Sequence, residues 1–235
     1  MNSSRWTVAA ACALLAACAQ AQSPSPAPAP ETASRPAARS SSDVCARPEV
    51  DSLVNVRTLD PSIRADIRYA TTNNFTGEIL PGYEKPLAML RPGPAAALVR
   101  VHRRLAADGL GLKIFDAYRP IRATQAMVRW AERSGNRWVL DQGYVARRSG
   151  HNVGATVDLT LVRLGDGEEL DMGTPFDTFS EAAHPANATG RVLENRMKLA
   201  RAMAAEGFGA YEKEWWHFRL PGDFAALDIP LRCYP

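Results

Sequence analysis

Apolar residues recur at helical spacing in three segments of the chain, residues 94–108, 122–133 and 189–206. The first has a proline in its first turn and stops at Gly109, and the last ends at Gly207. Proline near the start and glycine after the end are typical helix boundaries. The pattern therefore predicts three amphipathic helices.

The sequence pattern predicts strands in three other segments. Residues 112–118 and 156–162 alternate between the two faces, and the second is rich in β-branched residues. Residues 211–220 form an aromatic-rich stretch that we predict to be a single strand. Helices and strands mix without regular βαβ alternation, which favours an α+β class. We expect one domain with a small, mainly antiparallel sheet and helices packed against it.

The N-terminus has the pattern of an export signal. Arg5 precedes an uncharged stretch over residues 6–19, which is too short to span a membrane as an anchor. Residues 15–18, Leu-Ala-Ala-Cys, resemble the bacterial lipoprotein box, in which the cysteine is lipidated. We therefore expect a signal peptide over residues 1–21 and a lipid anchor at Cys18. Simple secretion by cleavage near Ala21, with no anchor, is the alternative.

Composition separates a linker from a folded body. Residues 22–42 contain five Pro, six Ser and five Ala, a mixture that forms an extended spacer and no core. Residues 43–235 are long enough for one hydrophobic core. The formal net charge of the whole chain is only +3, so nothing indicates nucleic acid as a partner. No protein partner is implied either.

Two cysteines, Cys45 and Cys233, lie at the two ends of the folded body. In an oxidising compartment they can form a disulfide that joins these ends. Two free buried thiols are the alternative.

Three separated segments carry candidate chemistry. SGHNVGATVDLTL contains His151 and Asp158, EKEWWHF contains Glu214 and His217, and FDAYRP contains Arg119. Two imidazoles and a carboxylate suit zinc, and three protein ligands leave a fourth position for water. Each residue alone has a simpler interpretation as a hydrogen-bonded histidine, a strand-end cap or a solvated charge. The spacing of three between Glu214 and His217 also requires a bulge or bend, because a straight strand would place them on opposite faces.

Together these segments resemble the D-alanyl-D-alanine dipeptidases, the zinc enzymes of vancomycin-resistant bacteria and of cell-wall turnover. The resemblance begins at DIRYATTNNFTG (residues 66–77) and GYE (82–84). It continues through DAYRP, GYVARRSGHNVGATVDLTL and MGTPFD, and ends at EWWH. It therefore runs through most of the folded body. Gly150 and Val153 differ from the Ser and Arg of the family pattern, which leaves the shape of the pocket open.

The resemblance implies one zinc ion per chain, carried by the sheet and held by His151, Asp158 and His217. Glu214 would be the catalytic base, and Arg119 would stabilise the developing oxyanion. The implied substrate-binding residues are Asp177 for the substrate ammonium group and Ser149, Tyr69 and Tyr83 as further pocket positions. The implied activity is hydrolysis of D-alanyl-D-alanine to two D-alanines.

Two rival functions use the same residues. A peptidoglycan D,D- or L,D-carboxypeptidase or endopeptidase would act on longer stem peptides, and TNNFTG and MGTPFD argue against it. A zinc-stabilised binding module would not need both Glu214 and Arg119. The export signal predicts a periplasmic or cell-envelope location, where the enzyme would meet dipeptide released in wall turnover.

Overall fold

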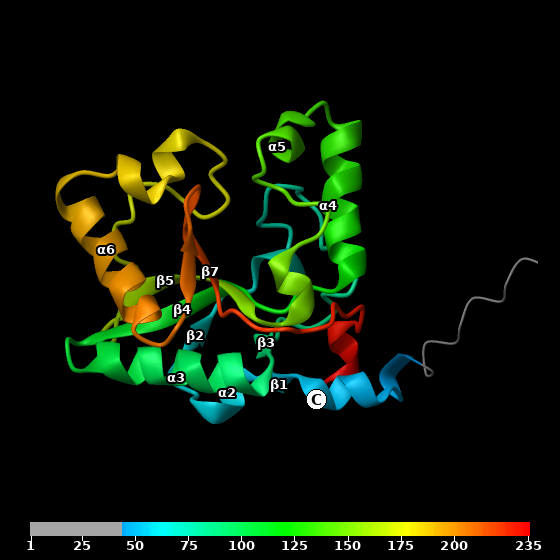
Figure 1. The fold of residues 1–235 in the computed structure, drawn as a ribbon, viewed down its shortest axis with the longest axis horizontal. Coiled ribbons are helices and arrows are strands. Elements are labelled where there is room, and N and C mark those ends of the chain that lie inside the picture. Colours follow the sequence, from blue (N-terminus) through cyan, green and yellow to red (C-terminus); the bar gives the residue numbers. More distant parts are fainter. Residues whose placement is uncertain (1–43) are drawn as a thin grey trace, which may run out of the picture. The chain divides into compact units, whose positions relative to one another are not determined.

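The computed structural model describes residues 44–235, and a five-stranded sheet is the centre of this part. Its strand order is β2-β4-β5-β7-β6 (Figure 1). Only β2 and β4 run parallel, and the other neighbours are antiparallel. The expected α+β class with a mainly antiparallel sheet is confirmed. The strands are β2 (Arg64–Ala65), β4 (Leu110–Asp116), β5 (Thr156–Arg163), β6 (Gly209–Tyr211) and β7 (Glu214–Arg219).

The two longest strands form where β-branched and large apolar residues were found in the sequence. In β5 every residue but the last is buried, and β4 is nearly as buried. Strands that are covered on both faces have their apolar surface removed from water along their whole length, which stabilises the centre of the sheet. The single strand predicted over residues 211–220 is wrong in one respect. A turn at residues 212–213 divides this region into β6 and β7.

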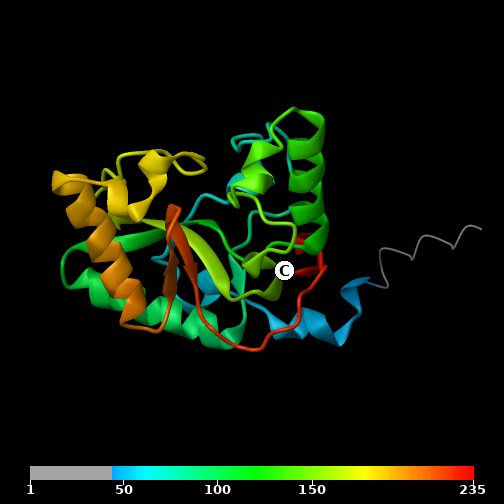
Figure 2. The ribbon, with the colours of Figure 1, turned by 45° about the horizontal axis from the view of Figure 1, so that its top comes forward.

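The three predicted helices are present as α3 (Pro92–Ala106), α4 (Ile121–Arg133) and α6 (Gly190–Ala204). Helix α3 packs against β4 and also contacts α6. Helix α4 lies at the other end of the sheet with the short helix α5 (Trp138–Asp141), as both views show (Figures 1 and 2). The sheet thus has helices on two sides, and its middle strands reach the space between them.

Short elements complete the part of the chain that the structure describes. Helix α2 spans Val56–Leu59, and a two-stranded antiparallel sheet pairs β1 (Val54–Asn55) with β3 (Met89–Leu90). Single-turn 3₁₀ segments are η1 (Pro48–Ser52), η2 (Arg68–Ala70), η3 (Gly150–Val153), η4 (Glu181–Ala183), η5 (Pro185–Asn187) and η6 (Leu231–Cys233). A disulfide joins Cys45 to Cys233 across a separation of 188 residues.

The expected signal peptide over residues 1–21, its lipidation site Cys18 and the linker over residues 22–42 lie outside the described residues. Among residues 44–235, none of the helices has both the length and the apolar character that crossing a membrane requires.

Candidate metallopeptidase active site

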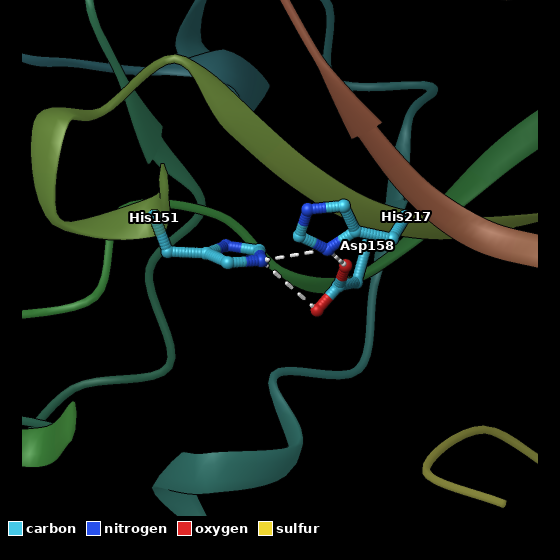
Figure 3. Close-up of side chains that lie close together, drawn as sticks. All are labelled: His151, Asp158 and His217. Carbon is cyan, nitrogen blue, oxygen red and sulfur yellow. Dashed lines mark hydrogen bonds and ion pairs between the residues drawn. The ribbon is translucent and has the colours of Figure 1, made fainter. Parts of the chain in front are cut away.

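Three side chains from two segments of the sequence meet at the middle of the sheet. His151 comes from η3, while Asp158 of β5 and His217 of β7 are direct cross-strand partners (Figure 3). Nε2 of His151 lies 3.2 Å from Oδ2 of Asp158, and Nδ1 of His217 lies 2.9 Å from Oδ1. The two imidazole nitrogens are 3.3 Å apart. The structure thus brings all three predicted ligands together.

This triangle of donor atoms has the size of a tetrahedral metal site. Ligand atoms about 2.0–2.2 Å from zinc lie roughly 3.3–3.5 Å from one another. The second ring nitrogen of His151, Nδ1, lies 2.7 Å from the carbonyl oxygen of Ala117 and donates to it. That bond leaves the lone pair of Nε2 directed at the cluster, which is the usual outer support of a metal-binding histidine. The residues present therefore fit a zinc ion.

The pKa values of Asp158 and His217 also favour cation binding by this cluster. Burial opposes ionisation of Asp158, but the nearby His151 and His217 outweigh it and hold the pKa of Asp158 below its usual value. Burial is also the main reason that the pKa of His217 is lowered. An ionised carboxylate and imidazoles with a free nitrogen lone pair are the forms in which these side chains bind a metal.

Glu214 lies in the same cavity because β7 is irregular at its start. Tyr211 pairs with Glu214, whereas the adjacent Ala210 pairs with Phe218, so three residues of β7 have no partner on β6. This is the bulge that the spacing of three requires. Oε2 of Glu214 lies 3.7 Å from Nδ1 of His217. Burial first, and then the charges of Asp158 and Asp177, raise the pKa of Glu214 well above its ordinary value, as suits a proton-transfer group.

Arg119 reaches the cluster from the segment that follows β4. Its Nη2 lies 3.8 Å from Oδ2 of Asp158, and its guanidinium packs over the ring of Tyr69 at 4.9 Å. Nε and Nη2 of Arg119 lie 2.9 and 2.8 Å from Oδ2 of Asp116. A fixed cation beside the metal ligands can stabilise negative charge that develops on a substrate.

Asp116 is a residue that the sequence analysis missed. It is fully buried, and a bulge in β4 between Ile114 and Asp116 places it opposite Asp158. It also accepts a hydrogen bond of 2.5 Å from the hydroxyl of Tyr83. A charged residue at the end of an apolar strand, inside the FDAYRP motif, was the available signal.

Asp177 lines the cavity together with Tyr69. The hydroxyl of Tyr69 donates to both carboxylate oxygens of Asp177, at 3.1 and 3.2 Å. Burial, reinforced by the charge of Asp158, raises the pKa of Asp177 well above its ordinary value. A cation bound beside this carboxylate would relieve its burial cost. Asp177 also has φ +62°, the left-handed conformation, which only a few residue types adopt readily.

The other two predicted pocket residues differ in their placement. Ser149 lines the cavity and caps η3, since its hydroxyl accepts the backbone N–H of His151 at 3.2 Å. Tyr83 is buried behind the cavity and is not among its lining residues. The structure therefore gives Tyr83 a supporting role through Asp116 and not direct access to the cavity. Asn152, which was also missed, donates to the carbonyl of Arg119 at 2.8 Å and ties η3 to that loop.

The cavity is small and bridged at its mouth. Its volume is about 240 Å³, and its walls include all three metal-ligand candidates, Glu214, Arg119 and Asp177. Tyr211 donates to the carbonyl of Gly143 at 3.1 Å, and Lys213 donates to the carbonyl of Gln142 at 2.6 Å. On the same side, the hydroxyl of Tyr144 lies 3.0 Å from Nε2 of His184. These contacts, which we call the mouth bridge, connect the β6–β7 turn and the segment before α6 to residues 142–144.

A His-Asp-His cluster with a buried glutamate and an arginine in one cavity defines the active site of a metallopeptidase. Residues 49–234 match the family of D-ala-D-ala dipeptidases, peptidase family M15. The chain belongs to this family.

Two curated relatives support that assignment over most of their length. A D-alanyl-D-alanine dipeptidase of Streptomyces coelicolor is 39% identical over 200 residues, which cover 77% of this chain and 96% of the relative. One of Enterococcus faecium is 35% identical over 189 residues, which cover 72% of this chain and 93% of the relative. Among solved structures, a mutant of the vancomycin-resistance D,D-pentapeptidase VanY in complex with Zn(II) matches with a TM-score of 0.36 and 17% identity. That match covers 57% of this chain and 74% of the other chain.

Proposed function

We propose that the protein is a dipeptidase that hydrolyses D-alanyl-D-alanine and binds one zinc ion per chain. The observation that carries this proposal is the meeting of His151, Asp158 and His217 with Glu214 in one cavity of about 240 Å³. The curated relatives named D-alanyl-D-alanine dipeptidases support the choice of substrate. A cavity of this size suits a dipeptide better than a polymer.

Each side chain in the cavity has its own role in the reaction. Zinc held by His151, Asp158 and His217 would supply Lewis-acid activation of water at neutral pH. Glu214 takes the proton from the attacking water and returns it to the leaving amine. Arg119, fixed by Asp116, stabilises the oxyanion as the amide carbon becomes tetrahedral. Asp177 with Tyr69 holds the substrate ammonium group and so sets the position of the scissile bond.

An amine-release assay on the full chain tests this function. D-alanyl-D-alanine, its L,L isomer and a stem pentapeptide ending in D-alanyl-D-alanine are compared with and without a chelator. We expect chelator-sensitive cleavage of the free D,D dipeptide, and its loss in Glu214→Gln. Glu212→Gln, an exposed carboxylate in the turn before β7, is the matched control. Cleavage of the stem peptide alone would indicate a carboxypeptidase, and zinc binding without any cleavage would indicate a binding module.

We also propose that the enzyme works in the cell envelope, anchored by lipid at Cys18, and that it recycles dipeptide released in wall turnover. The support is the uncharged stretch over residues 6–19, the Leu-Ala-Ala-Cys box and the linker composition. Detergent phase partitioning of the expressed protein should place it with membrane proteins, and Cys18→Ser should release it to the aqueous phase. Active enzyme in a cytoplasmic fraction would contradict the recycling role.

A further inference from the structure

A second hollow adjoins the catalytic cavity on the outer side of His217. This groove has a volume of about 580 Å³ and shares three lining residues with the cavity: Gly150, Tyr211 and His217. Its other walls come from β6, the end of β7 and the segment that follows β7. The groove therefore borders the reaction centre directly.

Among the described residues that line this groove, Arg219 is the only Lys, Arg, Asp or Glu. In the sheet, Thr156 pairs with Arg219 and Asp158 pairs with His217. Cross-strand partners, and residues two apart on one strand, share a face of the sheet. Arg219 thus stands beside His217 on the face that carries the metal-ligand candidates.

No hydrogen bond or ion pair connects the Arg219 guanidinium to any residue in the range 44–235, and its side chain is exposed. Most other arginines near the cavity do have partners, among them Arg119 with Asp116 and Arg147 with Glu132. Gly150, which lines both hollows, packs closely against this part of the sheet. A Cβ there would lie 2.7 Å from Oγ1 of Thr156 and 3.6 Å from Cδ of Arg219, so a side chain would not fit between the cavity and the groove.

The two hollows differ in charge. Three carboxylates, those of Asp158, Asp177 and Glu214, line the cavity beside the Arg119 guanidinium, whereas the described residues that line the groove include a cation and no carboxylate. A free dipeptide has the opposite arrangement at its two ends, an ammonium group on the first residue and a carboxylate on the second. With its ammonium group at Asp177, the carboxylate of the leaving residue would extend past His217 toward Arg219. Charge complementarity of this kind fixes the direction in which a zwitterion binds.

We propose that this groove is the carboxylate subsite and that Arg219 binds the C-terminal carboxylate of the substrate, an inference that rests on the proposed dipeptidase function. A guanidinium suits this task because it presents paired N–H donors to a carboxylate and keeps its charge. His217 adds a second donor. Its Nδ1 faces Asp158, and its Nε2 makes no hydrogen bond within residues 44–235. Metal-binding histidines usually donate this second N–H to a carboxylate, a carbonyl or water.

Binding to the zinc-loaded Glu214→Gln protein, measured by titration calorimetry, tests the subsite without turnover. The probes are D-alanyl-D-alanine and its C-terminal amide, which differ only in the carboxylate. We expect Arg219→Gln to weaken binding of the acid about tenfold, as for a charge-assisted hydrogen bond, and to leave binding of the amide unchanged. Arg219→Lys should retain part of the preference. Arg191→Gln, an exposed arginine at the start of α6, is the matched control and should change neither.

An unchanged preference for the acid in Arg219→Gln would overturn the subsite while leaving the dipeptidase function intact. N-acetyl-D-alanine separates the two hypotheses, because it has the carboxylate but no ammonium group and no dipeptide. Its binding is followed by NMR shifts of the Gly209 and Gly222 amides, with N-acetyl-D-alaninamide for comparison. If the wild-type protein hydrolyses no dipeptide but these shifts depend on Arg219, the dipeptidase function fails and the carboxylate subsite stands. If the shifts do not depend on Arg219, the subsite is wrong.

Discussion

Arg119 and Asp116 form a buried ion pair directly behind the metal-ligand candidates, with Nη2 2.8 Å and Nε 2.9 Å from the same carboxylate oxygen. Because Nε and Nη2 of Arg119 are both bound to Asp116, the guanidinium is held in one orientation, beside Asp158 and the cavity. The hydroxyl of Tyr83 occupies the other oxygen of Asp116. Asp116 is thus a positioning residue for Arg119.

We expect Asp116→Asn to lower kcat about a hundredfold with little change in KM. Arg119 stays in the cavity, but its guanidinium is no longer oriented toward the oxyanion that forms in the transition state. Removing the carboxylate also leaves a buried guanidinium uncompensated, which costs roughly 3–5 kcal/mol of stability. Steady-state kinetics and urea unfolding measure the two effects. Tyr83→Phe removes only one hydrogen bond to Asp116 and should have a smaller effect on kcat. A folded Asp116→Asn protein with wild-type kcat would contradict this role.

Asp177→Asn should raise KM for D-alanyl-D-alanine by roughly tenfold or more, since a buried charged hydrogen bond to the ammonium group is lost. Asparagine is the appropriate replacement because it tolerates the left-handed backbone at φ +62°. The comparison substrate is N-acetyl-D-alanyl-D-alanine, which has no ammonium group. The variant should lose most of the wild-type preference for the free dipeptide over this compound. An equal loss on both substrates would mean that Asp177 acts on the fold and not on recognition.

The mouth bridge should limit the length of the substrate. Lys213→Ala removes the bond to the carbonyl of Gln142, and Tyr211→Phe removes the bond to that of Gly143. We expect the double variant to cleave a stem peptide more efficiently relative to the free dipeptide, by about tenfold in the ratio of kcat/KM values. Lys198→Ala, on α6 beside Asp108, is a matched control that should leave the ratio unchanged. An unaltered ratio in the double variant would show that the cavity walls, and not the bridge, exclude longer chains.

The long periodic segments could be predicted from the sequence, and the short irregular ones could not. Helix α4 (Ile121–Arg133) and strand β5 (Thr156–Arg163) agree with the expected boundaries to within one residue, because α4 buries one face at helical spacing and β5 is a continuous buried run rich in β-branched residues. The turn at residues 212–213 was missed because Glu-Lys contains none of the usual turn residues. Strands β1 and β3 have two residues each, too few to show a period.

The same difference applies to the site. His151, Asp158, His217 and Glu214 stand in recognisable motifs, and the structure brings them together. The contribution of Asp116 depends on a bulge in β4, and that of Arg219 depends on the pairing register of β7 with β5. Register and bulges are set by tertiary packing, so they leave little local signal in the sequence.

The disulfide between Cys45 and Cys233 closes a loop of 188 residues. In the chain-entropy model such a loop stabilises the folded state by up to roughly 5 kcal/mol. We expect the double variant Cys45→Ser/Cys233→Ser to show a lower free energy of unfolding, with activity at 25 °C retained, since neither cysteine lines the catalytic cavity. Reduction of the wild-type protein should lower its stability to a similar value. Loss of activity in a variant that remains folded would instead link the bridge to the site.

His102 makes the stability of the fold dependent on pH in a region remote from the metal-ligand candidates. The backbone N–H of Leu112 donates to Nδ1 of this buried histidine at 3.1 Å, so Nε2 carries the proton and faces Oγ of Ser62 at 2.9 Å. A second ring proton would point Nδ1–H at the Leu112 N–H. Burial is the main reason that the pKa of His102 is lowered, with Arg103 adding to this effect and Asp60 opposing it.

In the unfolded chain a histidine takes up its proton near pH 6.5, whereas His102 in the fold does so only at lower pH. The unfolded state therefore binds more protons in this interval, and the free energy of unfolding falls as the pH drops below about 6.5. The contribution of one group is at most about 1.4 kcal/mol per pH unit, and it levels off below the pKa of the folded state. Urea unfolding between pH 7.5 and 5 should show a steeper decline for the wild-type protein than for His102→Gln. Parallel curves for the two proteins would mean that His102 does not contribute.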